Sequence, residues 1–179
     1  ERRVTRSMTK NRGVIIGMKF RKFVTKTIIK KRLTNKNTIN NKEKDMTVEK
    51  KIIHYPDNSF STVILSQTIQ AMIYPERVIE NLIRIGNRAI ISFPNFGYWK
   101  VRGEFLFSGR MPKNKILPYE WFNTPNIHLC SYKDFYDFCN LKKIKIENFF
   151  SLNEEGDVIN NYFLINLFTY QVIFCVSKQ

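Results

Sequence analysis

Residues 62–94 determine the predicted fold and read TVILSQTIQAMIYPERVIENLIRIGNRAIISFP. Residues 62–65 and 89–93 are continuous β-branched and apolar runs, which are typical of strands covered on both faces. Between them, Pro75 suits the first turn of a helix, apolar residues recur at helical spacing, and Gly86 stands where helices commonly end. Strand, helix and strand in this order predict a βαβ unit with parallel strands and a right-handed crossover.

Two more strands are expected toward the C-terminus. Ile144 and Ile146 alternate with charged residues, and apolar residues at alternate positions mark residues 170–176 as the last strand. Before them, Ser131 and Asp134 have the spacing of a capping box at the start of a helix. Two closing strands after a βαβ unit indicate an antiparallel pair at the edge of the sheet. The helix is expected to place four residues on one face: Tyr132, Phe135, Tyr136 and Cys139.

The positive charge is concentrated in the first third of the chain. Residues 1–53 hold 17 Lys/Arg against 4 Asp/Glu, or +13 of the net +15, and residues 54–179 hold 13 against 11, or +2. We therefore divide the domain into a basic, divergent N-terminal part, 1–53, and a C-terminal part, 54–179. The first part is expected to contain a strand at 13–18, a helix at 23–32 and a loop at 36–51.

Such a basic arm could neutralise nucleic-acid phosphates. Its composition, rich in Lys, Asn, Ile and Thr and poor in aromatic residues, equally fits the product of an AT-biased coding sequence. Nucleic acid is therefore not the predicted partner, although a nucleic-acid-binding arm is kept as a third hypothesis.

Cysteine content and hydropathy indicate the expected cellular location of the protein. The three cysteines form no C-x-x-C pair, which argues against a disulfide framework or a zinc site, and the two histidines stand apart. No run reaches the roughly 18 apolar residues of a membrane span, and no signal peptide is visible. The expectations are a cytoplasmic protein with no metal and no membrane segment. Because the first residue is Glu1, the chain is expected to be a fragment.

Polar and aromatic side chains follow the two parallel strands where each strand ends. Ligands of open parallel sheets bind at this edge. Amides offer donors and acceptors and aromatic rings offer flat surfaces, so a neutral ring or an amino-acid part of a ligand suits the edge. The alternative is that the aromatic residues are core and the amides cap helices. The candidates are Ser66, Gln67 and Gln70 after the first strand, and Asn95, Phe96 and Trp99 after the second.

A third candidate segment, 124–130, contains Asn126 and His128. An imidazole can carry a proton near neutral pH, but no carboxylate or nucleophile stands beside His128 in sequence, so a hydrogen-bonded structural histidine is the alternative. Enzyme motifs are missing: no G-x-G-x-x-G loop precedes residues 13–18, and no G-x-S-x-G elbow occurs.

Several separate motifs match one known family in order and spacing. The matching segments within residues 54–177 are 55–71 (YPDNSFSTVILSQTIQA), 84–86, 92–97 (SFPNFG), 109–112, 117–119 and 124–130. On these segments the chain closely resembles the MetW family of methionine biosynthesis proteins.

The resemblance implies a Rossmann-like class I methyltransferase fold, mostly parallel with antiparallel closing strands, whose N-terminal part is incomplete here. It implies S-adenosylmethionine (SAM) as the type of cofactor, with contacts at Gly17, Ser66 and Gln67. The chain departs from the family where SAM would bind. A D-x-G-x-G loop has no counterpart, Ser61 stands where an aspartate is expected, and Lys19 replaces an acidic residue that would accept hydrogen bonds from the ribose.

Two functional hypotheses follow. In the first, which the resemblance implies, the chain acts in methionine biosynthesis by supporting a homoserine O-acyltransferase, without catalysis of its own. The residues most involved would then be the candidates at this edge of the sheet, which we call the rim: Gln67, Gln70, Asn95, Phe96, Trp99, Asn126 and His128. In the alternative, the chain belongs to an active SAM-dependent methyltransferase whose first strand and glycine-rich loop lie upstream of Glu1. The sequence leaves open whether the protein is an enzyme.

Overall fold

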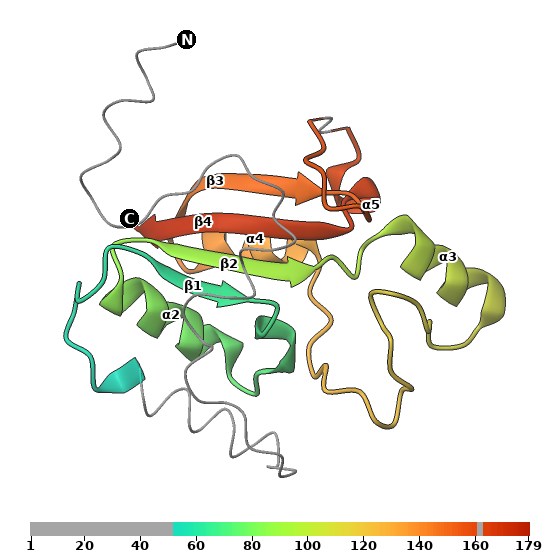
Figure 1. Ribbon diagram of the computed structural model, residues 1–179, viewed down its shortest axis with the longest axis horizontal. Coiled ribbons are helices and arrows are strands. Elements are labelled where there is room, and N and C mark those ends of the chain that lie inside the picture. Colours follow the sequence, from blue (N-terminus) through green and yellow to red (C-terminus); the bar gives the residue numbers. More distant parts are fainter. Residues whose placement is uncertain (1–51, 161–162) are drawn as a thin grey trace.

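The computed structural model describes residues 52–160 and 163–179 (Figure 1). The expected strand at 13–18, with Gly17, and the helix at 23–32 and loop at 36–51 lie outside the described residues. In chain order the elements are β1 (Val63–Ser66), the 3-10 turn η1 (Ile69–Ala71), α2 (Pro75–Ile85), β2 (Ala89–Pro94), α3 (Trp99–Ser108), α4 (Tyr132–Leu141), β3 (Ile144–Leu152), α5 (Ile165–Phe168) and β4 (Gln171–Lys178).

The described strands form one mixed sheet in the order β1-β2-β4-β3. β1 and β2 are parallel, as predicted, and α2 connects them. β4 is antiparallel to both β2 and β3, so β4 lies between them and completes the predicted antiparallel closing pair. A bulge between Ile146 and Asn148 lets β3 continue to Leu152, beyond the short alternating stretch that the sequence marked. Figure 1 shows this order from β3 at the top to β1.

The main core lies between one face of the sheet and two helices, α2 and α4. The buried strand residues belong to paired positions, such as Leu65 with Ile91 and Ile91 with Phe174, which places them on the same face. Residues of α2 and α4 pack on this row; Phe135 of α4 lies 4.7 Å from Phe174 between ring centroids. Burying such side chains contributes about 1.5–3 kcal/mol each, so this layer is the main source of stability. The core members are Leu65, Ile69, Met72, Val78, Ile79, Leu82, Ile83, Ala89, Ile91, Phe93, Phe135, Cys139, Val172, Phe174 and Val176.

Two local expectations need correction, and a third is confirmed. β1 stands at the end of the described sheet and Ile64 is exposed there, so within the described residues this strand is not covered on both faces. Tyr136 is also exposed, because the helix turns only Phe135 and Cys139 fully inward. Gly86 ends α2, as predicted, and its backbone is extended. A Cβ at Gly86 would lie 2.6 Å from Val63 Cγ2, so close packing of the helix end on β1 requires the glycine.

Two helix starts follow the sequence rules. Pro75 is the first residue of α2, where its missing N–H leaves no intrahelical bond unmade. Ser131 caps α4 through the complete capping box: its hydroxyl accepts from Asp134 N, and the Asp134 carboxylate accepts from Ser131 N at 2.9 Å. Both predictions are confirmed.

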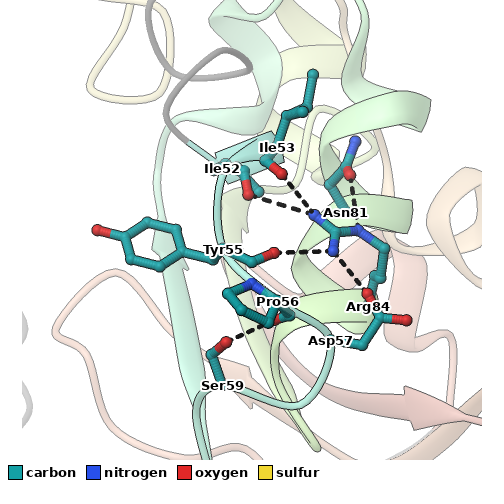
Figure 2. Close-up of polar contacts among 8 residues, drawn as sticks. All are labelled: Ile52, Ile53, Tyr55, Pro56, Asp57, Ser59, Asn81 and Arg84. Atoms are coloured by element: carbon teal, nitrogen blue, oxygen red, sulfur yellow. Dashed lines mark hydrogen bonds and ion pairs between the residues drawn. The ribbon is translucent and has the colours of Figure 1, made fainter.

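Arg84, near the end of α2, holds the turn that precedes β1 (Figure 2). Its guanidinium donates to Tyr55 O at 2.9 Å, to Asp57 Oδ1 at 2.6 Å and to Ile52 O at 3.3 Å, while its Nε donates to Asn81 Oδ1 at 3.2 Å. A planar guanidinium is suited to such multiple bonds. Arg84 therefore joins two of the matching sequence segments, 55–60 and 84–86, in the folded protein.

Candidate functional site at the carboxyl ends of β1 and β2

The ends of β1 and β2 lie side by side, as the sequence predicts. Ser66 pairs with Ser92 in the parallel register, and the Ser92 hydroxyl donates to Ser66 Oγ at 3.2 Å. The next residue, Gln67, donates its N–H to Ser92 O at 2.7 Å and has a left-handed backbone with φ of 47°. Such a backbone is uncommon for a residue with a side chain and is found at functional sites. The chain turns sharply here and leaves the Gln67 side chain exposed.

Gln70, in η1, connects this turn to the segment at 124–130. Its backbone carbonyl accepts hydrogen bonds from Ile127 N at 2.8 Å and His128 N at 3.0 Å. Its buried side chain donates from Nε2 to Gln67 O at 3.2 Å. The other side-chain atom, Oε1, is buried without a hydrogen-bond partner. An unpaired buried acceptor costs about 1–3 kcal/mol, and Gln70 Oε1 is an acceptor of this rim that no described residue uses.

Asn95 is fully buried and all the bonds of its amide are used within the protein. Its Nδ2 donates to Asn166 O at 2.9 Å and to Thr169 O at 2.7 Å, and its Oδ1 accepts from Gly97 N at 3.0 Å and Tyr132 N at 3.1 Å. The amide thus ties the end of β2 to α5 and to the start of α4. This geometry matches the structural alternative for the amide, with no group left over for a ligand.

The aromatic residues after β2 separate into buried and exposed ones. Phe96 and Tyr98 are buried and pack with the start of α3, whereas Trp99 is exposed, with Lys100 Nζ 5.5 Å from its ring centroid. Sequence reasoning assigned no element to residues 99–108 and so missed α3. The reason is that α3 carries no apolar stripe: Val101 is its only buried residue.

Asn126 and His128 lie beside the turn after β1. The backbone N–H of Asn126 donates to Thr124 Oγ1 at 3.1 Å. Among the described residues its side-chain amide makes no hydrogen bond to a distant part of the chain. His128 is exposed, and its Nε2 lies 3.4 Å from Ile73 O. No carboxylate approaches the imidazole among the described contacts, so the arrangement offers no oriented acid–base pair there.

Glu154, which sequence reasoning missed, joins the turn after β3 to the start of α3. Its carboxylate accepts from the Tyr98 hydroxyl at 2.9 Å and forms an ion pair with Lys100, with Lys115 Nζ 3.8 Å away. The hydrogen bond from Lys100 and then that from Tyr98 lower the pKa of Glu154. Burial, followed by the bond to Glu154, raises the pKa of the Tyr98 phenol. No sequence signal links these residues, because 56 positions separate Tyr98 from Glu154.

The cysteines are free thiols rather than nucleophiles. Burial raises the pKa of Cys130 and of Cys139 to about 12, so each thiol stays protonated at neutral pH and is a poor attacking group. In the described part of the chain no three acidic, histidine or cysteine side chains gather as a metal site would require. Within residues 52–160 and 163–179 no helix has the length and apolarity to cross a membrane.

The parallel β1–β2 pair with its helical crossover, closed by antiparallel β4 and β3, defines a Rossmann-like α/β protein of the class I methyltransferase type. The family model "Methionine biosynthesis protein MetW" matches residues 28–176, which is most of the chain. The chain belongs to the MetW family of methionine biosynthesis proteins.

One curated relative and several solved structures are similar to the chain. The relative, a bifunctional methionine biosynthesis protein MetXA/MetW of Rhodopirellula baltica (strain DSM 10527 / NCIMB 13988 / SH1), is 35% identical over 92 residues, which are 51% of this chain and 15% of that protein. The chain thus matches only a small part of the relative's length.

Among solved structures, a SAM-dependent methyltransferase of Thermotoga maritima has a TM-score of 0.48 at 18% identity, covering 70% of this chain and 59% of that one. Another, of Archaeoglobus fulgidus, has a TM-score of 0.45 at 11% identity, covering 73% and 65%. These likenesses are weak, and the strand order and directions carry the fold assignment.

Proposed function

We propose that this chain supports a homoserine O-acyltransferase in methionine biosynthesis and catalyses no reaction of its own. The observation that carries the proposal is the state of the rim, where the polar groups of Asn95 are spent on internal bonds and His128 has no acid–base partner among the described contacts. Such groups hold a shape and do not move protons. The R. baltica relative supports the partnership, because its name joins MetXA, a homoserine acyltransferase, and MetW in one protein.

Co-purification tests this proposal. The full chain, tagged, and the homoserine O-acyltransferase of the same host are expressed together, and the complex is measured by size-exclusion chromatography at micromolar concentration. The expected result is a shared peak that contains both proteins. Separate peaks, with each protein folded by circular dichroism, would overturn the proposal.

A cytoplasmic location belongs to the same proposal. The described thiols are all free, and free thiols are common in a reducing compartment. The division into a basic part, 1–53, and a nearly neutral part, 54–179, stays a prediction. Nucleic-acid binding by the first part also stays a hypothesis, and steep salt dependence of DNA or RNA retention would be required for it.

A second candidate function is SAM binding, as in an active methyltransferase completed by sequence upstream of Glu1. One observation favours it: Gln70 Oε1 is a buried acceptor without a partner at the edge where such sheets bind ligands. The described residues fit SAM to this extent, since Gln70 could accept an N–H of the ligand, and Ser66 and Gln67 border the same turn. SAM supplies an electrophilic methyl group when bound. Gln70 would orient the SAM molecule by accepting one of its N–H groups.

Calorimetric titration with SAM separates the two functions. If the rim binds SAM through Gln70, the wild-type chain gives saturable heat and Gln70→Met, which keeps the size and removes the amide, binds about tenfold more weakly. Absence of saturable heat in the wild-type chain would reject this candidate and leave the supporting role.

A further inference from the structure

Residues 99–130, the projecting segment, extend beyond the end of the sheet where β2 finishes (Figure 1). α3 and the loop that follows it form this segment. It has a small apolar core of its own, separate from the main one, in which Val101, Ile116 and Leu117 pack with Phe96 and Tyr98. The segment is therefore a supported part of the fold and presents its outer surface in a defined shape.

Hydrogen bonds hold the loop of this segment against α3. Asn114 Oδ1 accepts from Ile116 N at 2.9 Å and Leu117 N at 3.0 Å, and its Nδ2 donates to Glu104 Oε2 at 2.8 Å. Arg102 Nε donates to Gly97 O at 2.6 Å, which fixes the start of α3. These bonds keep the conformation that exposes the apolar side chains described next.

Large apolar side chains of the projecting segment face solvent. Leu106 is 76% exposed and Phe107 89%, on a helix that buries only Val101. In the loop, Trp121 is 73% exposed and lies 5.7 Å from Phe122 between ring centroids. Exposed groups of Trp, Phe and Met are unusual on a monomer and typical of protein interfaces. The exposed apolar residues of the segment include Phe105, Leu106, Phe107, Met111, Trp121 and Phe122.

Shape and charge indicate what this surface would contact. A shallow hollow of about 460 Å³ lies between α3 and the loop and is lined in part by Phe107, Met111 and Pro112, so an inserted side chain could be surrounded there. Residues 99–130 hold five Lys/Arg against two Asp/Glu. Within the described residues Arg110 forms no ion pair, so a free cation borders the apolar side chains. A complementary surface is apolar at its centre with carboxylates at its edge.

We propose that the projecting segment is the docking surface for the homoserine O-acyltransferase, which would present an apolar side chain to the hollow and carboxylates to Arg110. The inference rests on the proposed function and assigns it the exposed apolar side chains from Phe105 to Phe122, none of which is a rim candidate. A folded protein fits better than an anionic lipid surface, because the apolar site is hollowed and Glu104 and Glu120 stand within the segment.

The test uses the full chain, immobilised, and the host's homoserine O-acyltransferase in solution, with Kd measured by biolayer interferometry. The test variants are Leu106→Ser and Phe107→Ser, and the matched control is Leu141→Ser, because Leu141 is 78% exposed but ends α4. Their exposure means that none should disturb folding, which thermal melting checks. A second kind of variant, Arg110→Glu, tests the charge.

Leu106→Ser and Phe107→Ser should each raise Kd by about tenfold or more, and Leu141→Ser should leave it within about twofold. Arg110→Glu should slow association, and the effect should shrink at high salt. If the wild-type chain does not bind the enzyme, the proposed function itself fails. If it binds and the test variants bind equally well, only the surface assignment is overturned.

Two other occupants would appear as distinct results that overturn the inference. If the surface binds a second copy of the chain, Phe107→Ser will lower the mass of the protein alone in sedimentation and leave the affinity for the acyltransferase unchanged. If it binds lipid, wild-type protein will co-sediment with phosphatidylglycerol vesicles, Phe107→Ser will not, and acyltransferase binding will again be unchanged.

Discussion

Replacing Asn95 by alanine should destabilise the protein strongly, chiefly through lost hydrogen bonds. The Asn95 amide is fully buried and makes four hydrogen bonds, to Asn166 O, Thr169 O, Gly97 N and Tyr132 N. At about 1 kcal/mol net for each bond, and more where a backbone group stays buried without a partner, the loss in free energy of unfolding is about 3–5 kcal/mol.

Urea unfolding followed by tryptophan fluorescence measures this loss. The matched control is Asn148→Ala: Asn148 is exposed and its Oδ1 accepts a single bond, from Phe149 N at 2.8 Å, so the expected loss is about 1 kcal/mol or less. Asn95→Asp should cost at least as much as Asn95→Ala, since its carboxylate keeps the two acceptor bonds but is buried and faces two carbonyl oxygens. A loss below about 1 kcal/mol for Asn95→Ala would refute the view that this amide joins β2 to α4 and α5.

Three further predictions concern stability. Arg84→Ala should lower the free energy of unfolding by about 1–2 kcal/mol, a value kept small because the guanidinium is partly exposed. Arg84→Lys should recover less than half of this loss. Urea unfolding measures both variants, and equal stability of Arg84→Ala and wild type would contradict the role of Arg84. Gly86→Ala should destabilise the protein by about 1–3 kcal/mol, because the added Cβ would collide with Val63. Gly103→Ala should stabilise it by about 0.5–1 kcal/mol, because Gly103 lies inside α3 with open space around it. A higher melting temperature for Gly86→Ala than for Gly103→Ala would refute this reasoning. Lys100 and Tyr98 lower the folded-state pKa of Glu154, so its contribution to stability is present above the ordinary carboxyl pKa and is lost as pH falls through the lowered value. In a plot of the urea unfolding midpoint against pH, Glu154→Gln should therefore reduce the slope on the acid side. An unchanged slope would argue against the cluster of Glu154, Lys100 and Tyr98.

The sequence predicts β1, α2 and β2 because each signal is local. Continuous apolar runs, Pro75 at the first turn and an apolar face at helical spacing all act within a few residues of where they are read. α3 escapes the same reasoning for a physical reason. Helical periodicity is visible only when one face is buried, and α3 buries Val101 alone while exposing Leu106 and Phe107.

The sequence predicts where the rim lies, but it does not predict whether each rim side chain binds a ligand or another part of the protein. Parallel strands bring Ser66 and Ser92 to one edge, and this follows from the βαβ pattern. Whether an amide there binds a ligand or the protein depends on partners distant in sequence. Asn95 finds its partners 71 and 74 positions away at Asn166 and Thr169, and no local pattern reports such a distance. The Gln70 amide differs from that of Asn95, because its Nε2 bonds a nearby residue, Gln67, and its Oε1 has no hydrogen-bond partner among the described residues.

The central claim, that the chain acts through an acyltransferase and not through methyl transfer, is tested most directly by one rate measurement. The steady-state rate of homoserine acylation by the host's enzyme is measured with and without the full chain, in the absence of SAM. A higher rate with the chain, unchanged by adding SAM, is the expected result. An acylation rate that the chain leaves unaltered, together with methyl transfer from SAM by the chain alone, would contradict the account.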